Sequence, residues 1–205
     1  MMVLPHGIVE GDLRVTDGLI KTIAPQGGLQ PRVGELVIDG TGLHLLPGAI
    51  DPHVHFRDPG HPEKEDLESG SRAAAAGGIT SFLDMPNTLP NATNRTALEA
   101  KIASASKKAV THHGFFIGAT TNNVPDLQSV EGMDGVCGIK IFMGSSTGDL
   151  LVHEQKHLRT FLQIREALLQ LMQKMRIDCN REFQSLNIVQ ILLRMQNIEI
   201  SSVHF

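Results

Sequence analysis

The sequence has few of the features that mark secreted, membrane-bound or nucleic-acid-binding proteins. It contains two cysteines, Cys137 and Cys179, whose spacing fits neither a metal site nor a redox motif, so reduced thiols are expected. No basic tract is present, and a net charge of -4 argues against a nucleic-acid-binding surface. No window has the length of a membrane span, and residues 1–10 lack the pattern of a signal peptide. The sequence therefore predicts a soluble globular protein of the cytoplasm that binds neither nucleic acid nor membrane.

Glycine and proline are absent from the last 57 residues of the chain. All 20 glycines lie at or before Gly148, and all 10 prolines lie at or before Pro125. After about residue 160, the segments 161–176 and 182–197 have the spacing of amphipathic helices with no turn residues to separate them. The composition therefore separates a helical tail from the rest of the chain.

From residue 46 onward, apolar strands alternate with helices. The predicted strands cover residues 48–56, 80–85, 114–120 and 135–143, and the predicted helices cover about 65–76 and 96–110. Such alternation implies a parallel sheet, and functional groups at the carboxyl ends of its strands are typical of a (β/α) barrel. His53, Asn87 and Lys140 all lie at or near such ends.

The segment 48–60 contains the most informative motif, in which two histidines close an apolar strand. Side chains alternate along a strand, so His53 and His55 are expected to point to the same side. Two imidazoles on one side can bind one metal ion. Arg57 follows on that side and offers a forked cation to a substrate carboxylate. The motif predicts a metal site beside an anion-binding residue.

Two further motifs connect this segment with a known family. The motifs FRDPG at residues 56–60 and DMPNT at residues 84–88 closely resemble those of the dihydroorotases of the amidohydrolase superfamily. Residues 138–144 resemble the strand that carries the carboxylated lysine of these enzymes. The resemblance covers about residues 5–160. It is specific because the histidine pair, the arginine, the Pro-Asn pair and the lysine occur in the family's order and approximate spacing.

The resemblance implies an α/β fold, the amino-terminal half of a metal-dependent (β/α)8 TIM-type barrel. The domains expected are a small β-sandwich segment over 1–45, a partial barrel over 46–160 and an unmatched helical tail over 161–205. Within the first segment, alternating or β-branched residues between glycine-rich turns predict strands over 11–15 and 35–39.

The resemblance also implies a zinc-dependent hydrolase that interconverts dihydroorotate and N-carbamoyl-L-aspartate in pyrimidine biosynthesis. Dihydroorotases usually hold two zinc ions, which polarise the amide carbonyl and lower the pKa of a bridging water. His53 and His55 match the first metal ligands. Lys140 matches the bridging lysine, because a neutral lysine can take up carbon dioxide as a carbamate that spans two metals. Arg57 and Asn87 match the residues that hold the substrate carboxylate.

Arg57 favours an acidic small-molecule substrate. In the related allantoinases an asparagine commonly stands at this position, and hydantoinases also depart from the FRDPG pattern. An activity of the allantoinase or hydantoinase type remains an alternative.

The second half of the family pattern is missing from this sequence. That half supplies a histidine on each of two later strands and an aspartate that moves the proton, whereas His204 is the only histidine after His157. No catalytic residue is therefore identified. A complete barrel takes about 250 residues. The chain is expected to be an incomplete enzyme whose fourth barrel strand has an unpaired edge, and the alternative is a non-catalytic truncated fragment or interaction protein; homo-oligomerisation is left open.

Several simpler interpretations compete with the metal site. A His-X-His sequence alone more often serves packing, and Lys140 could extend to solvent from its apolar strand. The HEQKH sequence at 153–157 fits the His-Glu-x-x-His motif of zinc proteases, but no third ligand is evident. Residues 144–148 could form an anion-binding loop but fit a strand-to-helix turn better. His112 and His113 would point to opposite faces of a strand and are expected to be surface residues.

Overall fold

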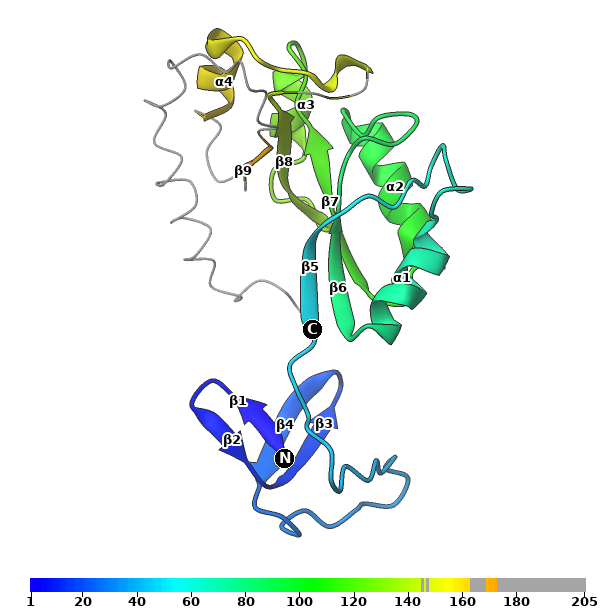
Figure 1. The fold of residues 1–205 in the computed structure, drawn as a ribbon, viewed down its shortest axis with the longest axis vertical. Coiled ribbons are helices and arrows are strands. Elements are labelled where there is room, and N and C mark those ends of the chain that lie inside the picture. The colour runs from blue at the N-terminus through cyan, green and yellow to red at the C-terminus, as the bar shows by residue number, and fades with distance from the viewer. Residues whose placement is uncertain (145, 147, 163–168, 173–205) are drawn as a thin grey trace. The chain divides into compact units, whose positions relative to one another are not determined.

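The structure is a computed structural model that describes residues 1–144, 146, 148–162 and 169–172 (Figure 1). The chain divides into two compact units, one comprising Met1–Gly48 and the other beginning at Ala49. Each unit is described by itself. No helix among the described residues has the length and apolar character needed to cross a membrane.

The first unit contains two antiparallel hairpins. Strand β1 (Met2–Leu4) pairs with β2 (Gly7–Val9), and β3 (Asp12–Thr16) pairs with β4 (Leu19–Ala24). The second hairpin turns at Asp17 and Gly18, which both have positive φ angles of 52° and 73°. Asp-Gly is a favoured sequence for such a two-residue turn, because both residues tolerate the left-handed conformation.

The strand predicted over residues 11–15 is confirmed as β3, but the strand predicted over residues 35–39 is wrong. Residues 35–40 are irregular, and Leu36 and Ile38 are 87% and 82% exposed. The segment is instead held at one point, where Arg14 Nε lies 2.6 Å from Glu35 Oε1. β-branched residues favour a strand only where a neighbouring strand supplies hydrogen bonds.

The second unit is built on a five-stranded parallel sheet in which spatial order follows chain order. Its strands are β5 (Ala49–Val54), β6 (Ile79–Asp84), β7 (His112–Gly118), β8 (Val136–Phe142) and β9 (Leu169–Met172). The first four confirm the predicted strands. The sheet is the parallel half-barrel expected from the sequence.

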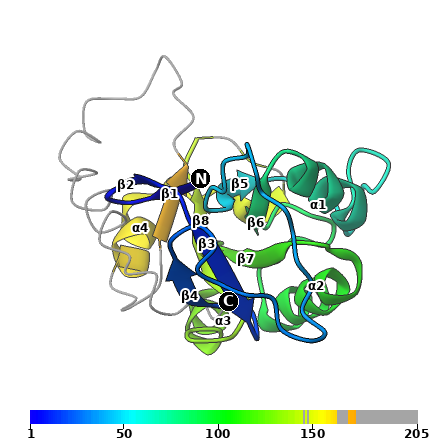
Figure 2. The ribbon, with the colours of Figure 1, turned by 90° about the horizontal axis from the view of Figure 1, so that it is seen from below.

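Helices connect these strands. They are α1 (Leu67–Ala76), α2 (Arg95–Lys108), α3 (Val124–Ser129) and α4 (Gln155–Leu162), with a short 3₁₀ helix over Gly148–Leu150. Helices α1 and α2 lie side by side and pack on β6 and β7 (Figures 1 and 2). Both predicted helices are confirmed. Helix α3 was not predicted from the sequence, because it has only six residues and no side-chain cap.

The prediction of a helix over residues 161–176 is wrong. Helix α4 ends at Leu162, and β9 pairs in parallel with β8, so the edge expected to be unpaired has a partner. A short segment of three apolar residues and one glutamine fits a strand as well as a helix, and an open sheet edge offers hydrogen bonds that favour the strand. The second predicted helix, over residues 182–197, lies outside the described residues.

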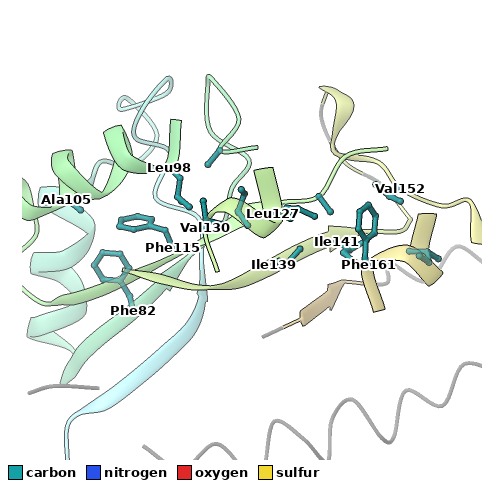
Figure 3. Packing of buried hydrophobic residues seen from close by; sticks show 14 of the residues in the cluster. Phe82, Leu98, Ala105, Phe115, Leu127, Val130, Ile139, Ile141, Val152 and Phe161 are labelled. Carbon is teal, nitrogen blue, oxygen red and sulfur yellow. The ribbon is translucent and has the colours of Figure 1, made fainter. Parts of the chain in front are cut away.

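The core of the second unit lies between the sheet and its helices (Figure 3). The rings of Phe82 and Phe115 are fully buried with centroids 6.4 Å apart, and Phe56 packs edge-on against Phe82 at 4.7 Å. Gly70 of α1 is required here, because a Cβ atom at this position would lie 2.6 Å from the Phe56 ring. This packing brings the segment after β5 against α1.

Candidate metal centre

The two histidines of the motif meet at the carboxyl end of β5. Nε2 of His53 lies 3.3 Å from Nε2 of His55, and the ring planes are inclined by 49°. His53 is exposed, whereas His55 is half-buried. The convergence of the two nitrogens agrees with the strand alternation that predicted imidazoles on one side. Two adjacent imidazole nitrogens at a protein surface provide suitable donors for a transition metal.

Asn87 contacts the second histidine from the neighbouring loop, which follows β6. Its Oδ1 atom lies 2.7 Å from Nδ1 of His55. When Nδ1 donates its hydrogen to this oxygen, Nε2 keeps the lone pair that faces His53. The resemblance gave Asn87 a role in substrate binding, and the structure adds this contact to a histidine ring.

Burial and nearby positive charges favour the neutral form of both imidazoles. Burial lowers the pKa of His53, and the charge of Lys140 lowers it further. Burial also lowers the pKa of His55, an effect that the Asn87 contact opposes and the charge of Arg57 increases. A neutral imidazole is the form that binds a metal. The positive charge of Lys140 acts on both histidines, and that of Arg57 acts on His55.

Lys140 lies within β8, and its residue is 0% exposed. The alternative in which its side chain extends to solvent is therefore wrong. Burial lowers the pKa of Lys140 to about 8, because the ammonium form loses its hydration. Its Nζ atom lies 5.4 Å from the centroid of the Phe142 ring. The protein thus holds an amine that can lose its proton near neutral pH.

The loops after β5 and β6 are joined to each other by hydrogen bonds. Met85 N donates to Val54 O at 3.0 Å, and Leu89 N donates to Pro59 O at 3.0 Å. Next to the half-buried Arg57, the buried Asp58 forms an ion pair of 2.6 Å with Lys108 of α2. The segment that carries the histidines and the arginine is therefore fixed against the loop that carries Asn87.

Sequence reasoning missed one buried ion pair in this region. Asp84 at the end of β6 lies 2.8 Å from Lys101 of α2, and both side chains are almost completely buried. Burial raises the pKa of Asp84 and lowers that of Lys101, while each partner opposes the other's shift. The only sign of this pair in the sequence was a lysine, Lys101, on the otherwise uncharged buried face of a helix. Its partner could not be predicted, because the pairing depends on tertiary packing.

The donors present fit part of a metal centre. Within the described ranges, no group of three or more His, Cys, Asp or Glu residues is placed to hold a metal ion. His53 and His55 supply two nitrogen donors, and Lys140 becomes a donor only after its ammonium loses a proton. The two imidazoles therefore fit part of a metal centre, and the ligand set of His53, His55 and Lys140 stays a prediction.

The HEQKH motif does not form the arrangement of a zinc protease. His153 and Glu154 precede α4, so His153 does not share a helical face with His157. Glu154 forms an ion pair of 2.7 Å with Lys156, and its carbonyl accepts a hydrogen bond from His157 N. The protease interpretation is wrong.

The remaining candidate residues have other positions. His112 is exposed at the start of β7, whereas His113 is half-buried with its ring 6.0 Å from that of Phe82, so only His112 lies at the surface as expected. The thiol of Cys137 is free, and burial raises its pKa. Cys179 and His204 lie outside the described residues, as does part of the 144–148 loop.

Comparisons with known proteins agree on one family. The family model described as Amidohydrolase family matches residues 44–177. A dihydroorotase of Methanosarcina acetivorans is 39% identical over 132 residues, which are 64% of this chain and 28% of that protein. An allantoinase of Desulfitobacterium hafniense is 39% identical over 142 residues, which are 69% of this chain and 31% of that protein.

A solved structure shows the same relationship. The L-hydantoinase of Arthrobacter aurescens superposes with a TM-score of 0.68 at 27% sequence identity. The match covers 79% of this chain and 36% of the hydantoinase chain. This chain thus spans about a third of the length of the proteins that it matches.

Proposed function

The chain belongs to the amidohydrolase family, and on that premise we propose that the carboxyl end of its parallel sheet is the first part of a zinc centre for cyclic amide hydrolysis. The favoured activity is that of a dihydroorotase, which interconverts dihydroorotate and N-carbamoyl-L-aspartate. The observation that carries this proposal is the 3.3 Å approach of the Nε2 atoms of His53 and His55.

Each nearby residue has a defined part in this proposal. His53 and His55 bind the metal as neutral imidazoles, and Asn87 holds the His55 ring in the orientation that leaves Nε2 available. Bound zinc would polarise the amide carbonyl of the substrate and supply hydroxide near neutral pH. The described residues include no proton-transfer group in the family's catalytic position, so none is assigned.

Lys140 is proposed to become a ligand by carboxylation. With a pKa of about 8, about a tenth of this amine is neutral at pH 7. The neutral nitrogen forms a bond to the carbon of carbon dioxide and releases a proton, which gives a carbamate anion. The two carbamate oxygens can then bind metal ions, which an ammonium group cannot do.

Arg57 is proposed to select the substrate. Its positive charge acts on His55, and its guanidinium can hold a carboxylate through two parallel hydrogen bonds. Dihydroorotate and N-carbamoyl-L-aspartate carry such a carboxylate. The matched relatives include both dihydroorotases and allantoinases, so the arginine is the residue that favours the acidic substrate over the allantoinase alternative.

The first experiment measures zinc by elemental analysis and dihydroorotate hydrolysis on the same purified sample. We expect the wild-type chain to contain bound zinc. His53→Ala should reduce the zinc content at least tenfold, since one of two imidazole donors is lost. His44→Ala is the matched control, because His44 is an exposed histidine of the first unit. Arg57→Met should raise KM for dihydroorotate more than it lowers zinc content.

A second candidate function is a non-catalytic interaction protein or fragment of an enzyme. It is favoured by the absence, within the part of the chain that the structure describes, of a third His, Cys, Asp or Glu ligand. Zinc content and turnover that both equal those of His53→Ala would support this candidate and reject the enzymatic one.

A further inference from the structure

We propose that Asp84 and Lys101 are positioning residues for the candidate metal centre. Their buried ion pair holds the backbone of Phe56 in place. It thereby also positions His53 and His55, which precede Phe56, and Arg57, which follows it. This inference rests on the proposed function for its purpose, although the backbone contact exists independently of it. The hydrogen bonds of the pair to its surroundings go to the backbone of Phe56 and Met85, so it acts through the chain segment.

Asp84 connects β6 to the segment that follows β5. Its Oδ1 atom accepts a hydrogen bond of 3.0 Å from the backbone N of Phe56. Its Oδ2 atom lies 2.8 Å from Nζ of Lys101, and neither side chain is more than 1% exposed. Phe56 is the residue between His55 and Arg57, so a single backbone contact fixes the point from which both side chains extend.

Lys101 connects the same place to α2. Its Nζ atom donates a hydrogen bond of 2.7 Å to the carbonyl of Met85, the residue after Asp84. The same atom lies 5.1 Å from the centroid of the Phe115 ring. The ammonium therefore binds both the side chain at the end of β6 and the backbone immediately after it.

Regular strand pairing is interrupted within the histidine segment. The register between β5 and β6 shifts between Asp51 and Val54, the interval that contains His53. Val54 is the last residue of β5, and its carbonyl accepts from Met85 N. Two residues later, the Asp84 carboxylate supplies the acceptor for Phe56 N. The side chain thus extends the hydrogen bonding beyond the end of the strand.

Stability alone does not explain a buried ion pair at this position. Removing two charges from water is costly, and well-packed apolar residues often replace such pairs without loss of stability. An apolar pair would fill the same space but could not accept the hydrogen bond from Phe56 N. Accepting the hydrogen bond from Phe56 N is therefore what Asp84 does and an apolar residue cannot do.

A second lysine of α2 supports the same segment. Lys108 follows Lys101 by seven residues, which places both on one side of the helix, and it forms the ion pair of 2.6 Å with Asp58. Its side chain is 45% exposed, so water weakens this ion pair. Helix α2 therefore holds the chain at Phe56 through buried groups and at Asp58 through a partly exposed one.

Two double variants of the full chain separate the acceptor from the charges. Asp84→Asn with Lys101→Met removes both charges but keeps an oxygen that can accept from Phe56 N. Asp84→Leu with Lys101→Met removes the charges and the acceptor. Replacing both partners together avoids an unpaired buried charge, which would strongly destabilise the protein. Arg72→Met is the control, because it removes an ion pair of 3.0 Å with Glu68 in which both side chains are exposed.

The first readout is zinc affinity by titration, and the second is the amide exchange rate of Phe56 by NMR. We expect the Asn variant and Arg72→Met to stay near the wild-type affinity, and the Leu variant to bind zinc about tenfold more weakly with faster Phe56 exchange. Far-UV circular dichroism checks that all variants remain folded.

Equal zinc affinity and equal Phe56 exchange in the two double variants would overturn the positioning role. A wild-type chain that binds no zinc would instead contradict the proposed function. In that case the Phe56 exchange rate still decides the inference: faster exchange in the Leu variant supports it, and unchanged exchange rejects it. The two failures are therefore distinguishable.

Discussion

The two units differ in how far their apolar side chains are exposed to solvent. In the first unit, Val33, Leu36 and Ile38 are more than 80% exposed, whereas Phe82 and Phe115 of the second unit are fully buried. The first unit has local hairpins with good turn residues, and the second has strands connected by helices that cover the sheet. The comparison shows that local signals are enough to form strands, but a core needs a second layer.

The second unit also contains all five predicted site residues. The carboxyl ends of parallel strands meet at one edge of the sheet, so His55 and Asn87 meet although they are 32 residues apart in the chain. The antiparallel hairpins of the first unit only pair residues that are close in sequence. The layered architecture of the second unit therefore provides both the hydrophobic core and the candidate site.

Truncation of a core ring tests the difference most strongly. Phe115→Ala should lower the free energy of unfolding by about 3–5 kcal/mol, because it leaves a cavity in the buried cluster. Leu36→Ala, at an exposed position of the first unit, should change it by less than about 0.5 kcal/mol. Urea unfolding followed by far-UV circular dichroism measures both, since the chain has no Trp or Tyr. Equal losses would show that the first unit buries Leu36 in solution.

A methyl group added to a glycine should also act differently in the two units. Gly70→Ala should destabilise the protein by about 1–3 kcal/mol, because the new Cβ would lie 2.6 Å from the Phe56 ring. Gly40→Ala is the control, since a Cβ at Gly40 meets no atom within 4 Å. Thermal unfolding of the two variants measures the difference. A neutral Gly70→Ala would mean that α1 does not pack this closely on Phe56.

The cap of α2 is expected to have a smaller effect. The side chain of Asn94 accepts a hydrogen bond of 2.9 Å from Ala97 N at the start of the helix. Asn94→Ala should therefore cost about 1 kcal/mol, and Asn94→Asp should keep most of the stability. Urea unfolding compares the three proteins. Equal stability of the Ala and Asp variants would argue against the cap.

The smallest expected effect is a pH dependence in the first unit. Hydrogen bonds from the Arg14 side chain and the Arg32 backbone lower the pKa of Glu35. A carboxylate with a lowered pKa in the folded state stabilises the fold above its unfolded pKa, and this contribution is lost as the pH falls through the folded pKa. The protection of amides around Glu35, measured as the exchange rate relative to an unstructured chain at the same pH, should therefore fall in acid, and Glu35→Gln should remove that change. A pH response unchanged in Glu35→Gln would assign it to another group.

The sequence was sufficient to predict the elements whose periodicity is sustained. Strands β5 to β8 and helices α1 and α2 follow from alternating apolar segments, and the convergence of His53 and His55 follows from strand geometry alone. It failed at short apolar segments, where tertiary partners decide. Leu169–Met172, predicted to be helical, forms a strand that pairs with β8. Residues 35–39, predicted to form a strand, pair with no other strand.

The sequence predicted only those residues of the candidate site that belong to a recognisable motif. The motifs contain His53, His55, Arg57, Asn87 and Lys140, and the structure brings the second histidine into contact with the asparagine. The Asp84–Lys101 ion pair was not predictable, because its partners are 17 positions apart in the chain and their contact depends on how α2 packs on the sheet. Pairs of this kind follow from packing and leave no local pattern.

The sequential order of the sheet has a consequence for synthesis on the ribosome. Each strand from β6 to β9 pairs with the one made just before it, so each new strand can dock onto an edge that already exists. Asp84 and Lys101 are made soon after Phe56, whereas Lys140 is translated 84 residues after Phe56. At about 5–20 residues per second, the histidine segment is expected to be held in place several seconds before the buried lysine arrives.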